Sequence, residues 1–162
     1  MGTYSGFVMT SKLRADAPQH VVDILSGLIA RSEPPEIESP PDHPFFRCAR
    51  WGQIGANLYG WKWPGEPDGF SISQACAGGG MDFTVRSIQR NDDREFDKFV
   101  DWISPFLDAT DGDVIAQMQS EVAYGPTFYI FGGRKISWGD VRGDLGAWPS
   151  DRGGRSGCDC DR

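Results

Sequence analysis

The hydrophobic and polar positions of the chain repeat one pattern twice, about 76 residues apart: a strand followed by a helix. The copies run from Tyr4 to Ala30 and from Met81 to Ala109. In the first helix, one apolar face is formed by Val21, Ile24, Leu25 and Leu28. In the second helix, the apolar face is formed by Phe96, Phe99, Val100, Ile103 and Leu107. Spacings of three and four residues predict amphipathic helices that cover a sheet.

Each copy also carries the same signal at the start of its helix. Asp16 is followed three residues later by Gln19, and Asp92 by Glu95. This spacing predicts a capping box, in which the two side chains accept hydrogen bonds from free amides of the first turn. Pro105 should bend the second helix, or end its regular hydrogen bonding about one turn earlier.

Four further segments read as extended chain. The segment 45–52 opens with two phenylalanines, and residues 70–75 alternate and should pair with Met81–Gln89 as a hairpin. Segments 113–122 and 126–131 are short strand candidates, and the second is rich in aromatic and β-branched residues.

Together these elements predict an α+β fold in the order β-α-β-β-β-α-β-β. We expect one mostly antiparallel sheet with both helices packed on one face. Five prolines and four acids make residues 31–44 a surface loop. A single domain should span residues 1–134. Residues 135–162, rich in Gly, Asp and Arg, should form a flexible tail.

Charge narrows the classes of partner. The net charge is −7, and residues 135–162 hold five bases and five acids, so the excess lies within residues 1–134. An acidic surface disfavours nucleic acids and anionic membranes, keeps the protein soluble, and could favour a basic protein partner.

The sequence shows neither a signal peptide nor an apolar run long enough to span a membrane. Four cysteines are too few for a disulfide scaffold, which predicts reduced thiols in the cytoplasm.

Candidate chemistry is sparse. His43 and Cys48 could form a thiol–imidazole pair, although no nucleophile turn surrounds the cysteine. Cys158 and Cys160 are spaced too closely for a structural zinc site. We therefore predict no metal and no cofactor. The neighbouring carboxylates Asp92, Asp93 and Glu95 are explained by helix capping. No catalytic residue is therefore assigned, and a non-enzymatic function is favoured.

Two groups of residues are candidates for binding. The segment Trp61-Lys62-Trp63, with Glu66 and Asp68 behind it, places two large aromatics beside a Pro-Gly turn. Exposed tryptophans anchor protein partners, although the same pair could instead cover the open face of the sheet. The alternative is an anion site for a small molecule or substrate, lined by arginines: Arg47, Arg50, Arg86 and Arg90.

The run Pro41-Asp42-His43-Pro44-Phe45-Phe46, followed by Arg50-Trp51 and later by Trp102-Ile103-Ser104-Pro105, resembles a scattered group of small uncharacterised bacterial and phage proteins. The resemblance covers about residues 4–131. It implies the α+β fold and the domain limits, and it carries over no functional residue.

Three functions follow as hypotheses. The first is a small acidic protein-interaction module of bacterial or phage origin, such as an immunity-type or inhibitor protein that acts by occlusion. The second is a small-molecule-binding protein or enzyme that uses the arginine-lined site. The third is an oligomeric structural component of a phage particle.

Overall fold

The computed structural model describes residues 2–30, 37, 40–54, 72–73 and 80–137. Its strands are β1 (Tyr4–Leu13), β2 (Ile72–Ser73), β3 (Met81–Arg90), β4 (Val114–Ser120), β5 (Thr127–Ile130) and β6 (Arg134–Ser137). Its α-helices are α1 (Gln19–Ala30) and α2 (Glu95–Ile103). Three short 3₁₀ helices are η1 (Pro44–Arg47), η2 (Trp51–Gln53) and η3 (Ser104–Phe106).

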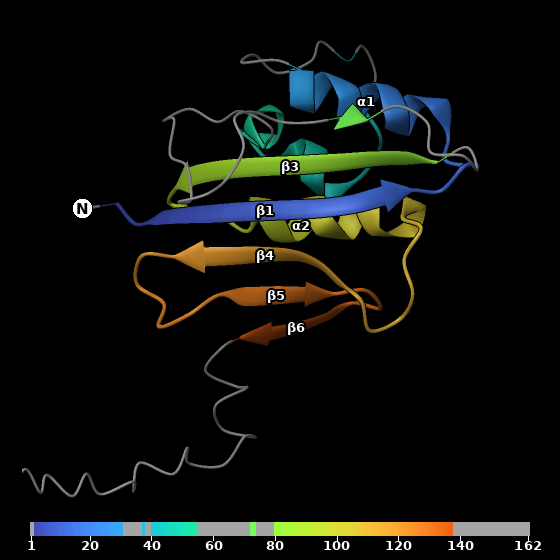
Figure 1. Cartoon of the computed structure of the whole chain (residues 1–162). Coiled ribbons are helices and arrows are strands. Elements are labelled where there is room, and N and C mark those ends of the chain that lie inside the picture. The colour runs from blue at the N-terminus through green and yellow to red at the C-terminus, as the bar shows by residue number, and fades with distance from the viewer. Residues whose placement is uncertain (1, 31–36, 38–39, 55–71, 74–79, 138–162) are drawn as a thin grey trace, which may run out of the picture.

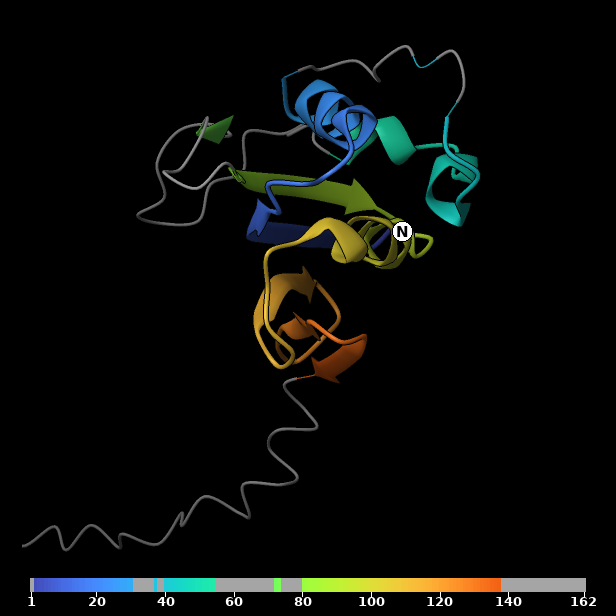
Figure 2. The same ribbon diagram turned by 90° about the vertical axis from the view of Figure 1, so that its right-hand side faces the viewer.

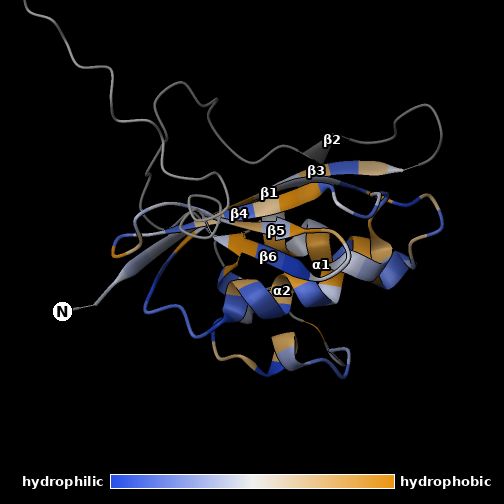
Figure 3. Ribbon diagram, turned by 90° about the horizontal axis from the view of Figure 1, so that it is seen from below, coloured by the Kyte–Doolittle hydropathy of each residue, from blue (hydrophilic) through white to orange (hydrophobic). Residues whose placement is uncertain are grey.

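The strands form one antiparallel sheet in the order β2-β3-β1-β4-β5-β6, shown face-on in Figure 1. The first strand of the chain, β1, therefore lies in the middle, between β3 and β4. Both helices pack on one side of this sheet (Figures 2 and 3). The α+β fold with an antiparallel sheet is confirmed. The short β2 pairs with β3 at Ile72 and Ser73, within the predicted hairpin.

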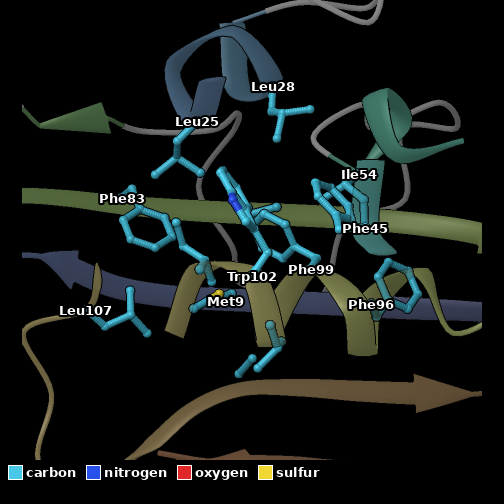
Figure 4. Packing of buried hydrophobic residues seen from close by; sticks show 14 of the residues in the cluster. Met9, Leu25, Leu28, Phe45, Ile54, Phe83, Phe96, Phe99, Trp102 and Leu107 are labelled. Atoms are coloured by element: carbon cyan, nitrogen blue, oxygen red, sulfur yellow. The ribbon is translucent and has the colours of Figure 1, made fainter. Parts of the chain in front are cut away.

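The core lies between the sheet and the helices. Phe7 and Met9 of β1 and Phe83 of β3 are at most 1% exposed and face the helical layer. The ring of Phe96 on α2 stacks on Phe7, with 4.7 Å between the ring centroids. Figure 4 shows side chains from α1, α2 and η1 meeting over β1 and β3. Burying each such side chain contributes about 1.5–3 kcal/mol, so this face fixes where the helices lie.

The segment predicted to be extended at 45–52 is instead helical, as η1 and η2. The Nδ1 atom of His43 accepts a hydrogen bond from the amide of Phe45 at 3.2 Å and caps η1. In a strand, successive side chains point to opposite faces. Here Phe45 and Phe46 are both buried, and both rings pack against Trp102 of α2. Burial of both rings on one side therefore outweighs their preference for strands.

The predicted capping box does not form at α1. The side chain of Gln19 donates instead to Asp23, at 2.8 Å, and Asp16 pairs with Arg14. The helix begins at Gln19, one residue after Pro18, which cannot donate a backbone hydrogen bond.

At α2 one of the two expected contacts forms and the other is shifted by one residue, because the helix begins at Glu95 with Arg94 as its N-cap. The amide of Glu95 donates to the carboxylate of Asp92 at 3.0 Å, and the carboxylate of Glu95 accepts from the amide of Asp93. The helix ends at Ile103 and continues as η3, which contains Pro105. The predicted end of this helix is confirmed.

The end of the domain differs from the prediction. Residues 135–137, assigned to the flexible tail, belong to β6, which pairs along its whole length with β5. Gly132 and Gly133 turn the chain between these strands, with φ angles of 95° and 83° that suit glycine. The described order is therefore β-α-β-β-α-β-β-β, with the extra strand at the end and no strand at 45–52.

Candidate protein-interaction site

The connection between β4 and β5, which we call the hairpin tip (residues 121–126), presents apolar side chains to solvent. Tyr124 is fully exposed, at 104%, and Val122 is 76% exposed. The tip projects from the end of the sheet where β1 begins (Figure 1). Single exposed apolar residues are common, but two of them within three residues concentrate apolar surface on one protruding turn.

The backbone of the hairpin tip is held in place by its neighbours. The side-chain amide of Gln119 donates to the carbonyls of Ser120 and Ala123, at 3.1 and 3.3 Å. Glu121 is tied twice to the start of β1: its amide donates to the carbonyl of Tyr4, and its carboxylate accepts from the amide of Tyr4, both at 3.0 Å. A turn fixed in this way loses little conformational entropy on binding.

A tyrosine presented in this manner suits the role of an anchor. Its ring offers a large apolar surface with few rotatable bonds, and its hydroxyl can form a hydrogen bond inside a partner pocket. The sequence prediction left residues 123–125 between two strand candidates and gave them no role. An aromatic residue beside Gly-Pro, between two alternating segments, is the signal that could have marked them.

The predicted partner-binding residues Trp61, Lys62, Trp63, Glu66 and Asp68 lie outside the described residues. They stay a prediction.

The four predicted anion-binding arginines are not brought together by the contacts of the described residues. Arg47 pairs with the exposed carboxylate of Asp42. Arg50 lies on the helical side and is used for internal contacts. Arg86 and Arg90 lie on the sheet positions that alternate with the buried ones, and so face away from the helices.

Arg50 joins η2 to the turn between β3 and α2. Its guanidinium donates to the buried carboxylate of Glu95 from Nε at 3.1 Å and from Nη2 at 2.7 Å. It also donates to the backbone carbonyls of Arg90 and Asn91, at 2.6 and 2.8 Å. These four bonds occupy the guanidinium on both edges. The structure therefore gives Arg50 a positioning role.

The same turn contains two carboxyl groups that share a small space. Burial, together with the adjacent Glu95, raises the pKa of Asp92 to about 6. Burial alone would also raise the pKa of Glu95, but hydrogen bonds from Asp92 and Arg50 hold it below its usual range. Glu95 is therefore the ionised partner and Asp92 is the group that takes up a proton first.

The thiol of Cys48 has a different partner from the one considered in the sequence. The ammonium of Lys98 on α2 lies 3.4 Å from the sulfur, and the thiol itself lies 3.5 Å from the carbonyl of Pro44. His43 uses its Nδ1 atom to cap η1. The Cys–His pair is therefore not formed in this arrangement.

A third polar group attaches the β5–β6 hairpin to α2. The hydroxyl of Tyr129 donates to Asp97 at 2.7 Å, and Lys135 and Arg94 pair with the same carboxylate. Burial and Asp97 raise the pKa of Tyr129 far above its usual value, so its hydroxyl stays protonated. Burial opposes ionisation of Asp97, but hydrogen bonds from Lys135 and Tyr129 leave its pKa below the usual range.

Within residues 2–30, 37, 40–54, 72–73 and 80–137, no group of three or more His, Cys, Asp or Glu side chains is placed to hold a metal ion. In that part of the chain, no helix has the length and apolar character needed to cross a membrane. Comparison with protein-family models, curated proteins and solved structures finds no match to this chain. The resemblance noted in the sequence stays a prediction.

Proposed function

We propose that the chain is a small protein-interaction module that acts by occlusion, as an immunity-type or inhibitor protein does, and that the hairpin tip is its main contact element. The observation that carries this proposal is the combination of a fully exposed Tyr124 and Val122 with a backbone held by Gln119 and Glu121. Rigid turns that insert an aromatic side chain into a partner pocket bind without a large entropic cost.

The charge distribution supports a partner that is basic where it meets the helical side. Residues 91–121 hold nine acids and two bases, a balance equal to the −7 of the whole chain. Asp93 and Asp101 are exposed on this side, and Glu121 lies at the base of the tip. Complementary charge would raise the association rate and orient the tip toward its pocket.

Site-specific photocrosslinking tests the proposal. A benzoylphenylalanine in place of Tyr124 is introduced in the organism that encodes the chain, and Ala49, which is exposed on the helical side, receives the same group as the control. We expect one discrete adduct from position 124 that is absent from position 49. Native protein in excess should compete it away, and Tyr124→Ala protein should not.

Occlusion is tested on the captured protein after its identification by mass spectrometry. The activity of the captured protein should fall when the native chain is added. The Tyr124→Ala variant should need at least about a tenfold higher concentration for the same inhibition, which is the typical cost of removing an anchor residue. Equal crosslinking from both positions, or full inhibition by the variant, would contradict the proposal.

A further inference from the structure

On the face of the sheet opposite the helices, called here the open face, three apolar side chains and one glutamine form a row across the strands. Val8 lies between the buried Phe7 and Met9 and therefore points away from the helices. Directly paired residues share a face, and the pairs Val8–Gln117, Gln117–Phe128 and Phe128–Ile136 continue the row across four strands. Val8 and Phe128 are partly exposed, and Gln117 and Ile136 are exposed.

The charge of the open face is opposite to that of the whole chain. Its charged positions in the strands are four bases, Lys12, Arg86, Arg90 and Arg134, and one acid, Asp82. The charge of Lys12 is compensated by an ion pair with Asp108 at 3.3 Å. The exposed acid of α2, Asp101, lies on the other side of the sheet, with the helix. Arg90 and Arg134 are the exposed bases among these strand positions and lie at the margins of the open face, so these two arginines give it positive charge in a protein of net charge −7.

We propose that the open face is a second interaction surface, separate from the hairpin tip, and that it binds an acidic protein segment in which apolar and acidic residues alternate. Apolar side chains of such a segment would cover the row from Val8 to Ile136. Its carboxylates would reach Arg90 and Arg134, whose guanidinium groups suit bidentate pairing with carboxylates.

A protein segment fits this face better than a nucleic acid does. Polyanion binding needs a dense array of cations along the backbone path, and the total charge of the chain repels a polyanion. Between its marginal arginines the open face offers Val8, Gln117, Phe128 and Ile136, a mixture of apolar and amide groups typical of protein interfaces.

Amide chemical-shift mapping of the full chain tests the proposal with three probes of equal length: a peptide alternating glutamate and leucine, poly-L-glutamate, and oligodeoxythymidylate. We expect the alternating peptide to bind most tightly and to shift amides of Val8, Gln117, Phe128 and Ile136. The double variant Arg90→Glu/Arg134→Glu should bind it at least about tenfold more weakly. The matched control is Arg47→Glu, which reverses an exposed charge on the helical side and should bind as the native chain does.

Spectra of the variants that match the native dispersion show that the fold is intact. Phe128→Ser tests the row independently of the arginines, because it removes an apolar side chain of the row and should weaken binding of the alternating peptide. The proposal is overturned if no probe shifts these amides, if the shifts fall on the helical side, or if the double variant binds like the native chain. Tighter binding of the oligonucleotide would overturn it in favour of a nucleic-acid surface. The hairpin tip is untouched by these variants, so crosslinking at position 124 reports separately on the proposed function.

Discussion

Replacing Arg50 by methionine tests whether the turn between β3 and α2 depends on a buried ion pair. Glu95 is 5% exposed in its side chain and Arg50 is 30% exposed, so the variant leaves a carboxylate with its main cationic partner removed. Breaking a buried pair in this way costs about 3–5 kcal/mol. Because Arg50 is partly solvated, we expect the lower end, about 3 kcal/mol, together with two lost bonds to backbone carbonyls.

The measurement is urea unfolding followed by tryptophan fluorescence, to which the buried Trp102 contributes. In thermal unfolding followed by the same fluorescence, a loss of about 3 kcal/mol should lower the melting temperature by about 10 °C for a domain of this size. The matched control is Arg47→Met, since Arg47 and Asp42 form a pair whose side chains are 72% and 88% exposed. That variant should change the free energy of unfolding by less than about 0.5 kcal/mol.

A second substitution separates the buried charge from lost packing. Adding Glu95→Gln to the Arg50→Met variant removes the unpaired carboxylate and should restore part of the lost stability. The reasoning is refuted if Arg50→Met and Arg47→Met have the same effect, or if the double variant is less stable than Arg50→Met alone.

Three further predictions concern stability. Folding raises the pKa of Asp92 from 3.8 to about 6, so its stabilising contribution is full below pH 4 and is lost as the pH rises through 6. In urea unfolding, the free energy of unfolding of Asp92→Asn should therefore rise relative to that of the native chain between pH 4 and 7. A difference that stays constant over this range would contradict the prediction. Gly132→Ala and Gly133→Ala should each destabilise the fold by about 1–2 kcal/mol in thermal unfolding, because both positions have positive φ. The added Cβ at Gly132 meets only the exposed carboxylate of Asp111, which can rotate away, so a much larger loss there than at Gly133 would contradict this reasoning. Tyr129→Phe should cost about 1.5 kcal/mol and speed amide exchange in β5 and β6, because it removes a bond to a carboxylate on α2; unchanged exchange would show that the bond does not hold the hairpin.

Several elements could be predicted from the sequence because their signals are local. The apolar stripe of α2 repeats at helical spacing, and its end is set by Pro105. The strands β1 and β3 are long enough for their composition to identify them. The carboxylate at Asp92 was correctly assigned to the start of a helix, where it accepts from the amide of Glu95.

Other elements depend on contacts between distant segments. Phe45 and Phe46 have strand-forming side chains, yet they belong to a 3₁₀ helix because Trp102, far along the chain, is where both rings are buried. The four residues of β6 are too short for a periodic signal and exist as a strand through pairing with β5. At α1 the predicted capping box does not form because both side chains have other partners, Asp23 for Gln19 and Arg14 for Asp16.

The sequence by itself determined the class of fold, the faces of the helices and the net charge, because these follow from composition and from spacings within one element. Only the tertiary structure decided which residues work together. It placed Arg50 on Glu95 rather than in an anion site, and it left Tyr124 on a fixed, protruding turn. It also separated a basic sheet face from an acidic helical side, since the direction in which each charge points is set by strand pairing and not by the order of residues.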